Sequence, residues 1–190
     1  GLGVIHRNLS VEKQLKQVEL VKKKHLKVAA AIGVGISEVE RAEGLLEKNI
    51  DRNSVLVSIG GGTLGDLSGF IASTILRGVD YVLVPTTLLS QVDSSIGGKN
   101  GINTKFGKNL IGTFYHPKEV IIDTNFIKTL PLREIKCGYA EIVKHSLIKD
   151  IKFFRWLEKN YIHLYNLNTN ILQKAIYKSI LIKLWYVGKD

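Results

Sequence analysis

The sequence is short of several residue types, and each shortage excludes something. It has one cysteine, no methionine, and no apolar run near the roughly 18 residues that span a bilayer. A lone Cys137 cannot form an internal disulfide, and its surroundings predict a small, partly buried helical residue rather than a nucleophile. The N-terminal stretch turns polar too soon for a secretory signal peptide. With no run long enough to span a bilayer, we expect no membrane partner. Because methionine is absent, residue 1 is not a translation start, and we expect a fragment, a processed product or a partial chain.

The composition is that of an ordinary globular protein with excess positive charge. Hydrophobic residues make up 45% of the 190 residues and charged residues 23%, enough for one domain with a core, or one and a fraction. The net charge of +10 favours an anionic partner, either nucleic acid or a phosphorylated or carboxylated metabolite. Much of this charge lies in residues 22–27 and in the lysine-rich C-terminal part, which are typical of solvated helix faces. No basic stretch is interleaved with stacking aromatics, so we do not expect nucleic acid as a partner.

Hydrophobic periodicity predicts an α/β protein. Residues 10–27, with Ser10 as N-cap, and residues 37–49 have helical spacing. The apolar run 55–59 predicts a buried strand, and a glycine-rich turn and a helix ending at Gly78 follow it. A second strand at 80–85 completes a βαβ unit, which implies a parallel sheet.

The second half of the sequence changes character. Residues 86–98 predict a helix or turn leading into a glycine loop, and residues 120–124 predict a third strand. From residue 135 onward the spacing is helical. We therefore expect residues 1–130 to form an α/β domain and residues 131–190 to begin an all-helical one.

The glycine turn is the first candidate site. Three glycines, Gly60 to Gly62, follow the strand and are followed by Gly65 and Asp66. Glycines at this point let a ligand approach bare backbone, and the next helix offers free N–H groups, an arrangement that suits a pyrophosphate. A tight structural turn explains the glycines equally well, and their spacing departs from G-x-G-x-x-G.

Further candidates follow the second strand. Thr86 and Thr87 stand where ligands bind in open α/β sheets, although a helix N-cap explains them too. Lys99 and Lys108 lie in glycine-rich segments that predict loops, and a lysine ammonium held there suits a phosphate.

One helical face carries a third set of candidates. Glu141, Lys144 and His145 share a face at i, i+3 and i+4. The acid and the lysine are consistent with a simple ion pair, and Glu141 with His145 would give a metal only two ligands, too few for a zinc site. The other histidines are scattered and predict surface or core positions: His6, His25, His116 and His163.

In this order, the motifs resemble those of the 3-dehydroquinate synthases, members of the sugar-phosphate cyclase family. The resemblance runs from about Ser37 to Asp190 and rests on GGGTLGD, PTT, DSSIGGK, GKN and AEIVK. It implies a dehydroquinate synthase-like fold, in which a Rossmann-like, parallel-sheet NAD-binding domain precedes an all-helical metal and substrate domain. It also implies a cytoplasmic carbon–oxygen lyase of the shikimate pathway, with a plastid as the alternative location. Such an enzyme converts 3-deoxy-arabino-heptulosonate 7-phosphate to 3-dehydroquinate and phosphate, using NAD and a divalent metal, zinc or cobalt.

The resemblance assigns a role to each matching residue. Glu141 would be a metal ligand, and Arg77 would reach the phosphate of a neighbouring subunit's substrate in a homodimer. Substrate or catalytic contacts are expected from Asp93, Lys99, Asn109, Lys144 and Lys183. Cofactor contacts are expected from Gly60, Gly61, Gly62, Thr63, Leu64, Gly65, Asp66, Thr86, Thr87, Asp93, Lys99, Lys108, Phe126, Ile127, Lys128 and Thr129.

Two departures from the family pattern leave other functions open. The segment AAAIGVGISEVE lacks the P-x-G-E-x-x-K pattern that grips the adenosine end of NAD, and the N-x-G-H-x-x-x-H metal ligands are absent. We therefore expect the chain alone to release no phosphate from the heptulosonate phosphate. The alternatives are a related cyclase acting on another sugar phosphate, and a truncated, non-catalytic nucleotide-binding module.

Overall fold

The computed structural model describes residues 3–5, 8–24, 28–30, 44, 51 and 53–189, in two compact units divided between Ser54 and Val55. In the first unit, β1 (Gly3–Ile5) pairs in parallel with β2 (Val28–Ala30), and α1 (Val11–Lys22) lies between them in sequence. The Ser10 hydroxyl accepts a bond from the Lys13 N–H, so the predicted N-cap is confirmed. The helix ends at Lys22 rather than at residue 27. Apart from Gly44, the helix predicted at 37–49 lies outside the described residues, as do the adenosine-side segment after Ala30 and the histidines His6 and His25.

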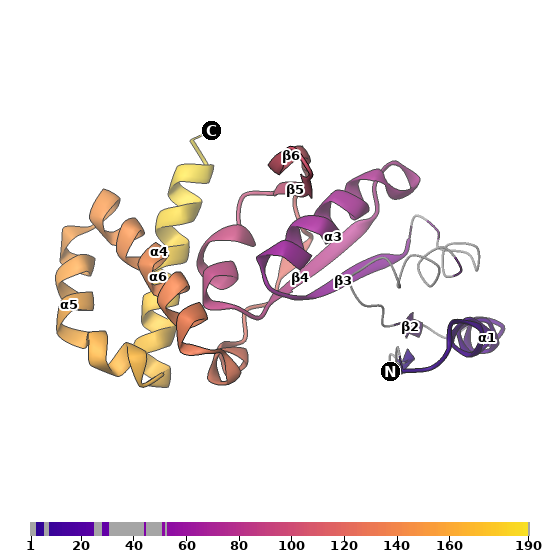
Figure 1. Cartoon of the computed structure of the whole chain (residues 1–190), viewed down its shortest axis with the longest axis horizontal. Helices are drawn as coiled ribbons and strands as arrows, with labels where there is room; N and C mark the ends of the chain where they lie inside the picture. The colour runs from indigo at the N-terminus through magenta and orange to yellow at the C-terminus, as the bar shows by residue number, and fades with distance from the viewer. Residues whose placement is uncertain are drawn as a thin grey trace. The chain divides into compact units, whose positions relative to one another are not determined.

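The second unit is built on a parallel sheet with the order β3-β4-β7, of which β3 and β4 are labelled in Figure 1. The sheet consists of β3 (Val55–Gly60), β4 (Asp80–Pro85) and β7 (Glu119–Val120). Gly60 pairs with Pro85, so the first two strands end together, as the βαβ pattern predicted. The third strand was predicted at 120–124 but is shorter, because Asp123 instead caps the 3-10 helix η4 (Thr124–Thr129) through its side chain.

Helix α3 (Gly62–Thr74) starts directly after β3 and packs along it (Figure 1). A short 3-10 turn, η2 (Ile75–Arg77), then leads to Gly78, whose φ of 121° requires glycine, so the predicted stop is confirmed. Leu76 and Arg77 have φ values of 51° and 67°, a conformation that strains residues with a Cβ.

A β-hairpin replaces the loops predicted around Lys99 and Lys108. Strand β5 (Lys99–Thr104) pairs antiparallel with β6 (Gly107–Phe114), so the loop prediction is wrong for both lysines. The hairpin packs on α3, where the Asn100 side chain sits over Gly69: a Cβ at Gly69 would lie 1.9 Å from Asn100 Oδ1. Asn100 also donates to the carbonyls of Gly98 and Tyr115, which anchors the start of the hairpin.

Three helices complete the second unit, as predicted from residue 135 onward. They are α4 (Leu132–Lys149), α5 (Ile151–Tyr165) and α6 (Thr169–Val187), capped at their N-termini by Asp150 for α5 and Asn168 for α6. Their core includes Leu88 and Val92 from the segment after β4, which ties the helices to the end of the sheet. Cys137 is exposed on α4, so the prediction of partial burial is wrong. Within the described ranges, no helix combines the length and the apolar character that crossing a membrane requires.

Candidate functional site

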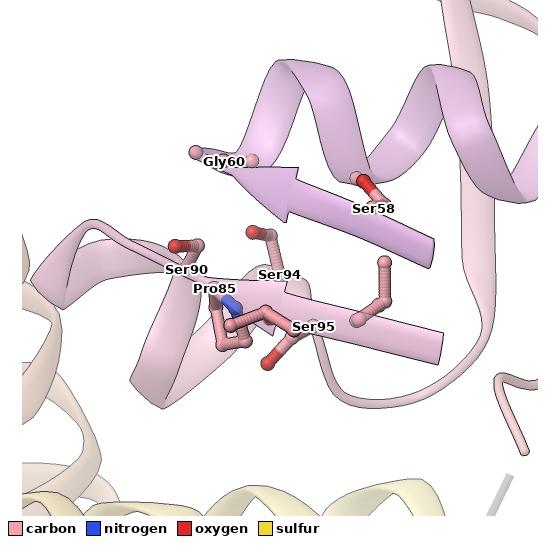
Figure 2. A pocket seen from close by; sticks show the side chains of 11 residues that line it. Ser58, Gly60, Pro85, Ser90, Ser94 and Ser95 are labelled. Atoms are coloured by element: carbon pink, nitrogen blue, oxygen red, sulfur yellow. The ribbon is translucent and has the colours of Figure 1, made fainter. Parts of the chain in front are cut away.

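A pocket lies at the carboxyl ends of β3 and β4, where the glycine turn was predicted to receive a ligand (Figure 2). Its walls come from the turn, from the end of β4 and from the π-helical turn η3 (Ser90–Ser94) with Ser95 after it. The glycines keep this space open, because a Cβ at Gly62 would lie 2.8 Å from Ser94 Oγ and one at Gly61 3.1 Å from Thr87 Cγ2. Gly61 is also the N-cap of α3, so no side chain caps the first N–H groups of that helix.

Two serines in this pocket were not predicted as site residues. Ser58 Oγ and Ser95 Oγ are buried, and neither has a hydrogen-bond partner in the described part of the chain. Buried hydroxyls without partners are uncommon, and these two line the same pocket as the glycines. Polar groups of a ligand would satisfy them. The sequence signal was weak, because single serines in a strand and in a turn are common.

The two threonines after β4, predicted either to meet a ligand or to cap a helix, have different roles in the structure. Thr87 Oγ1 accepts a bond from the Ser90 N–H, and the Ser90 hydroxyl accepts one from the Thr87 N–H. This reciprocal capping accounts for Thr87 as an N-cap. Thr86 donates its backbone N–H to the Gly60 carbonyl and thereby joins the two strand ends beside the pocket.

Asp93 and Lys183 meet although 90 residues separate them. Lys183 Nζ on α6 lies 2.6 Å from Asp93 Oδ1 in η3, and both side chains are 27% exposed. His145 and then Lys183 stabilise the carboxylate against the effect of burial, and they hold the pKa of Asp93 well below its usual value. Asp93 is therefore a fixed negative charge at any physiological pH.

The helical face of α4 joins this pair. Glu141 forms the expected ion pair with Lys144, and His145 Nε2 lies 3.3 Å from Glu141 Oε1 and 3.7 Å from Asp93 Oδ1. His145 is 3% exposed, and its Nδ1 lies 2.6 Å from Ser179 Oγ. The structure thus brings together five residues singled out from the sequence and adds Ser179; the five are Asp93, Glu141, Lys144, His145 and Lys183. We name these six residues the charged cluster.

The ligand atoms of the charged cluster suit a divalent cation. One oxygen of Asp93, one of Glu141 and one ring nitrogen of His145 lie within 4.8 Å of one another. Carboxylate oxygens are common zinc ligands, and a neighbouring imidazole serves either as a further ligand or as a group that orients the carboxylates. Glu141 Oε1 is also inaccessible to solvent and lacks a well-formed hydrogen bond within the described residues. The donor set therefore fits a metal at Glu141. The two carboxylates are already paired with ammonium groups, Glu141 with Lys144 and Asp93 with Lys183.

The remaining predicted residues lie on other elements of the second unit. Lys99 is exposed on β5, while Lys108 and Asn109 are exposed on β6, with Asn109 in the left-handed conformation at a φ of 54°. Arg77 is exposed at the strained turn before β4. In η4, Phe126, Lys128 and Thr129 are exposed or partly so, but Ile127 is fully buried in the helical core. A cofactor contact from Ile127 would have to come from its backbone.

Asp66, the last residue of the glycine motif, carries a charge that the folded chain disfavours. Burial, and then the nearby charge of Asp93, raises the pKa of Asp66 above its usual value of 3.8. The folded chain therefore binds this proton more tightly than the unfolded chain. The ionised carboxylate destabilises the fold at neutral pH, and this penalty disappears below about pH 3.8, where both states are protonated.

We therefore expect Asp66→Asn to raise the melting temperature of the chain at pH 7. The gain should shrink as the pH falls toward the range where Asp66 is protonated in both states. Thermal unfolding followed by circular dichroism across this pH range measures it. Glu158→Gln, at an exposed position on α5, is the control and should change little. A lower melting temperature for Asp66→Asn at pH 7 would contradict the assigned burial penalty.

A parallel sheet with a glycine turn at its carboxyl edge, followed by a helical segment whose charged face reaches that edge, defines the dehydroquinate synthase-like class of α/β folds. The chain belongs to the 3-dehydroquinate synthase family. The model of the family's N-terminal part, "3-dehydroquinate synthase N-terminal", matches residues 14–137, and that of its C-terminal part, "3-dehydroquinate synthase C-terminal", matches residues 138–190.

Individual relatives agree with this assignment. The chain is 59% identical over 146 residues to a 3-dehydroquinate synthase of Pelagibacter ubique, covering 77% of this chain and 40% of that protein. It thus spans about 40% of the length of the curated relatives that it matches. Among solved structures, ValA, a 2-epi-5-epi-valiolone synthase of Streptomyces hygroscopicus with NAD+ and Zn2+ bound, superposes with a TM-score of 0.78 at 26% identity, covering 99% of this chain and 55% of ValA. A 2-deoxy-scyllo-inosose synthase complexed with carbaglucose-6-phosphate, NAD+ and Co2+ superposes with a TM-score of 0.56 at 29% identity, covering 77% and 41% of the two chains.

Proposed function

We propose that this chain is part of a 3-dehydroquinate synthase, which converts 3-deoxy-arabino-heptulosonate 7-phosphate to 3-dehydroquinate and phosphate. The observation that carries the proposal is the convergence of Asp93, Glu141, Lys144 and Lys183 beside the glycine turn. The 59% identity to a 3-dehydroquinate synthase favours this reaction over that of the valiolone synthase, to which the identity is 26%.

NAD fits the pocket at the glycine turn. The bare turn, the uncapped first N–H groups of α3 and the two buried hydroxyls without partners would receive an anionic, polar ligand. NAD bound there would supply the transient oxidation of a substrate hydroxyl and its later reduction. Within the chain, Asp66 and Asp93 are close enough for their charges to interact, and both would orient a ligand bound near them.

A divalent metal fits at Glu141, where it would hold and polarise substrate hydroxyls. The two carboxylates of the charged cluster are balanced by Lys144 and Lys183, so the cluster alone is close to neutral. A divalent charge added at Glu141 would make the site positive and attract a substrate that carries a phosphate and a carboxylate. Lys99, Asn109 and Lys108 would add substrate and cofactor contacts from the hairpin.

We also propose that the enzyme of which this chain is a part forms a homodimer. Arg77 is exposed, and it lies in a turn where it and Leu76 both have positive φ values. Its proposed role is to reach the substrate phosphate of a second subunit, and this role needs an exposed guanidinium. The strained backbone supports a functional constraint at this turn.

Two measurements test the proposal. Calorimetric titration of the chain with NAD+ tests the pocket, with Gly62→Ala as the matched variant, because its Cβ would meet Ser94 Oγ at 2.8 Å. A chimaera in which residues 55–190 replace the corresponding residues of the Pelagibacter relative tests the reaction through phosphate release from the heptulosonate phosphate with NAD+ and Zn2+. A folded chimaera that releases phosphate only from another sugar phosphate would favour a different cyclase. One that binds NAD+ without turning over either substrate would favour the non-catalytic module.

In the chimaera, we expect Lys99→Ala to lower kcat/KM by about 10- to 100-fold, because it removes an ammonium group aimed at an anionic substrate. Lys105→Ala is the matched control. Lys105 lies at the turn of the same hairpin, and its ammonium group lies over the ring of its neighbour Phe106. Steady-state kinetics with the heptulosonate phosphate measures both variants. Equal effects of the two substitutions would refute the role of Lys99.

A further inference from the structure

His145 lies where α4, α6 and the π-helical turn after β4 meet, directly beneath the two carboxylates of the charged cluster. Its ring is 3% exposed, and Ser179, on the adjoining helix, is fully buried. Nδ1 lies 2.6 Å from Ser179 Oγ, while Nε2 lies 3.3 Å from Glu141 Oε1 and 3.7 Å from Asp93 Oδ1. The Nδ1 atom of His145 therefore faces a hydroxyl group, and its Nε2 atom faces two carboxylates.

The partners of Ser179 determine which ring nitrogen carries the proton. Its only hydrogen bond among the described residues is the one to His145, so its hydroxyl proton has Nδ1 as its acceptor. The single N–H of a neutral ring is then on Nε2, the atom that faces Glu141 and Asp93. The opposite tautomer would turn a nitrogen lone pair toward two carboxylate oxygens, which is electrostatically unfavourable.

The two lysines of the cluster hold these carboxylates through more mobile side chains. Lys144 and Lys183 are long side chains that are 56% and 27% exposed, so each retains rotamer freedom and contact with water. The imidazole is rigid and enclosed, and both carboxylates lie near the same nitrogen. Asp93 and Glu141 come from different elements, and His145 is the buried group that links them.

We propose that His145, oriented by Ser179, is a positioning residue that holds Glu141 and Asp93 in register with each other, and that it does not itself bind the metal. This inference rests on the proposed function for the roles of the two carboxylates. The positions of the atoms are independent of that function. A group that orients metal ligands typically changes metal affinity or activity by about 10- to 100-fold when it is removed.

The first test is the tautomer of His145 in the 190-residue chain. Long-range nitrogen–proton NMR correlations should show the proton on Nε2, and Ser179→Ala should produce a mixture of the two tautomers. Addition of Zn2+ should leave the Nε2 proton in place. A proton on Nδ1, or loss of the Nε2 proton when Zn2+ binds, would overturn the proposal and make His145 a ligand.

The second test compares two replacements of His145. Glutamine keeps an N–H donor within reach of the carboxylates, whereas phenylalanine fills the space without a donor. In the chain, His145→Phe should shift the side-chain carboxyl carbon resonances of Asp93 and Glu141, and His145→Gln should restore them in large part. His163→Phe, at an exposed position on α5, should leave both resonances unchanged.

In the chimaera, His145→Phe should lower kcat about 10- to 100-fold, with glutamine recovering most of it. Equal loss in both variants at equal melting temperature would overturn the positioning role. If the chimaera has no activity at all, the proposed function fails, while the tautomer and the carboxyl resonances still decide this inference. If the phenylalanine variant does not fold, the glutamine and Ser179→Ala results decide it.

Discussion

Replacing Lys183 by methionine should lower kcat/KM of the chimaera by about 100-fold or more and also destabilise the chain. Lys183 Nζ lies 2.6 Å from Asp93 Oδ1, and the two side chains share a site that is only partly open to water. Methionine fills similar space but leaves Asp93 without its closest cation. The loss of stability then exceeds the net contribution of the pair, because a partly buried carboxylate is left without its partner. A charge placed to meet an anionic substrate would be lost in the same step.

The control for this substitution is Lys152→Met, at an exposed position on α5, which should leave kcat/KM and the melting temperature nearly unchanged. Asp93→Asn and the Asp93→Asn/Lys183→Met double variant complete a thermodynamic cycle. Because the two side chains touch, the double variant should lose less than the sum of the single variants. If the two effects add to within about 0.5 kcal/mol, Lys183 acts independently of Asp93.

The sequence predicted the sheet and the charged cluster for different reasons. The unit from β3 to β4 could be predicted because its signals are local: an apolar run, consecutive glycines, a helical pattern and a glycine stop at Gly78. Asp93 and Lys183 came only from the family resemblance, since no spacing rule relates positions 90 residues apart. The contact exists because Leu88 and Val92 join the core of the three helices and carry η3 against α6.

The hairpin could not be predicted from local signals. Glycines at 101, 107 and 112 and asparagines at 100, 103 and 109 have low strand propensity, so the segment has the composition of a loop. Packing overrides that preference, because Gly69 on α3 leaves room for Asn100, whose amide bonds two backbone carbonyls. His145 was weighed only as half of a metal pair, because the sequence could not place Ser179 beside it.

The close approach of α4 to the segment after β4 makes Gly138 a position where one methyl group should be destabilising. A Cβ there would lie 2.5 Å from both Cβ and Cγ of Leu88 and 2.6 Å from the backbone nitrogen of Leu89. Leu88 is 1% exposed in the helical core, so it has no free space to move into. We expect Gly138→Ala to destabilise the chain by about 1–3 kcal/mol, although alanine is intrinsically the better helix former by up to about 1 kcal/mol.

Gly65→Ala on α3 is the matched control for this prediction, because its Cβ would meet only Leu83 Cδ2, at an ordinary 3.7 Å. It should be neutral or stabilising in urea unfolding, while Gly138→Ala unfolds at lower urea concentration. Adding Leu88→Ala should not restore stability, since the Cβ of residue 88 and the backbone of Leu89 remain in place. Glu141 lies on the same helix one turn beyond Gly138, so a displaced α4 would also separate Glu141 from Asp93 and lower activity in the chimaera. Equal stability of the two glycine variants would mean that α4 does not pack this closely on the segment that carries Asp93.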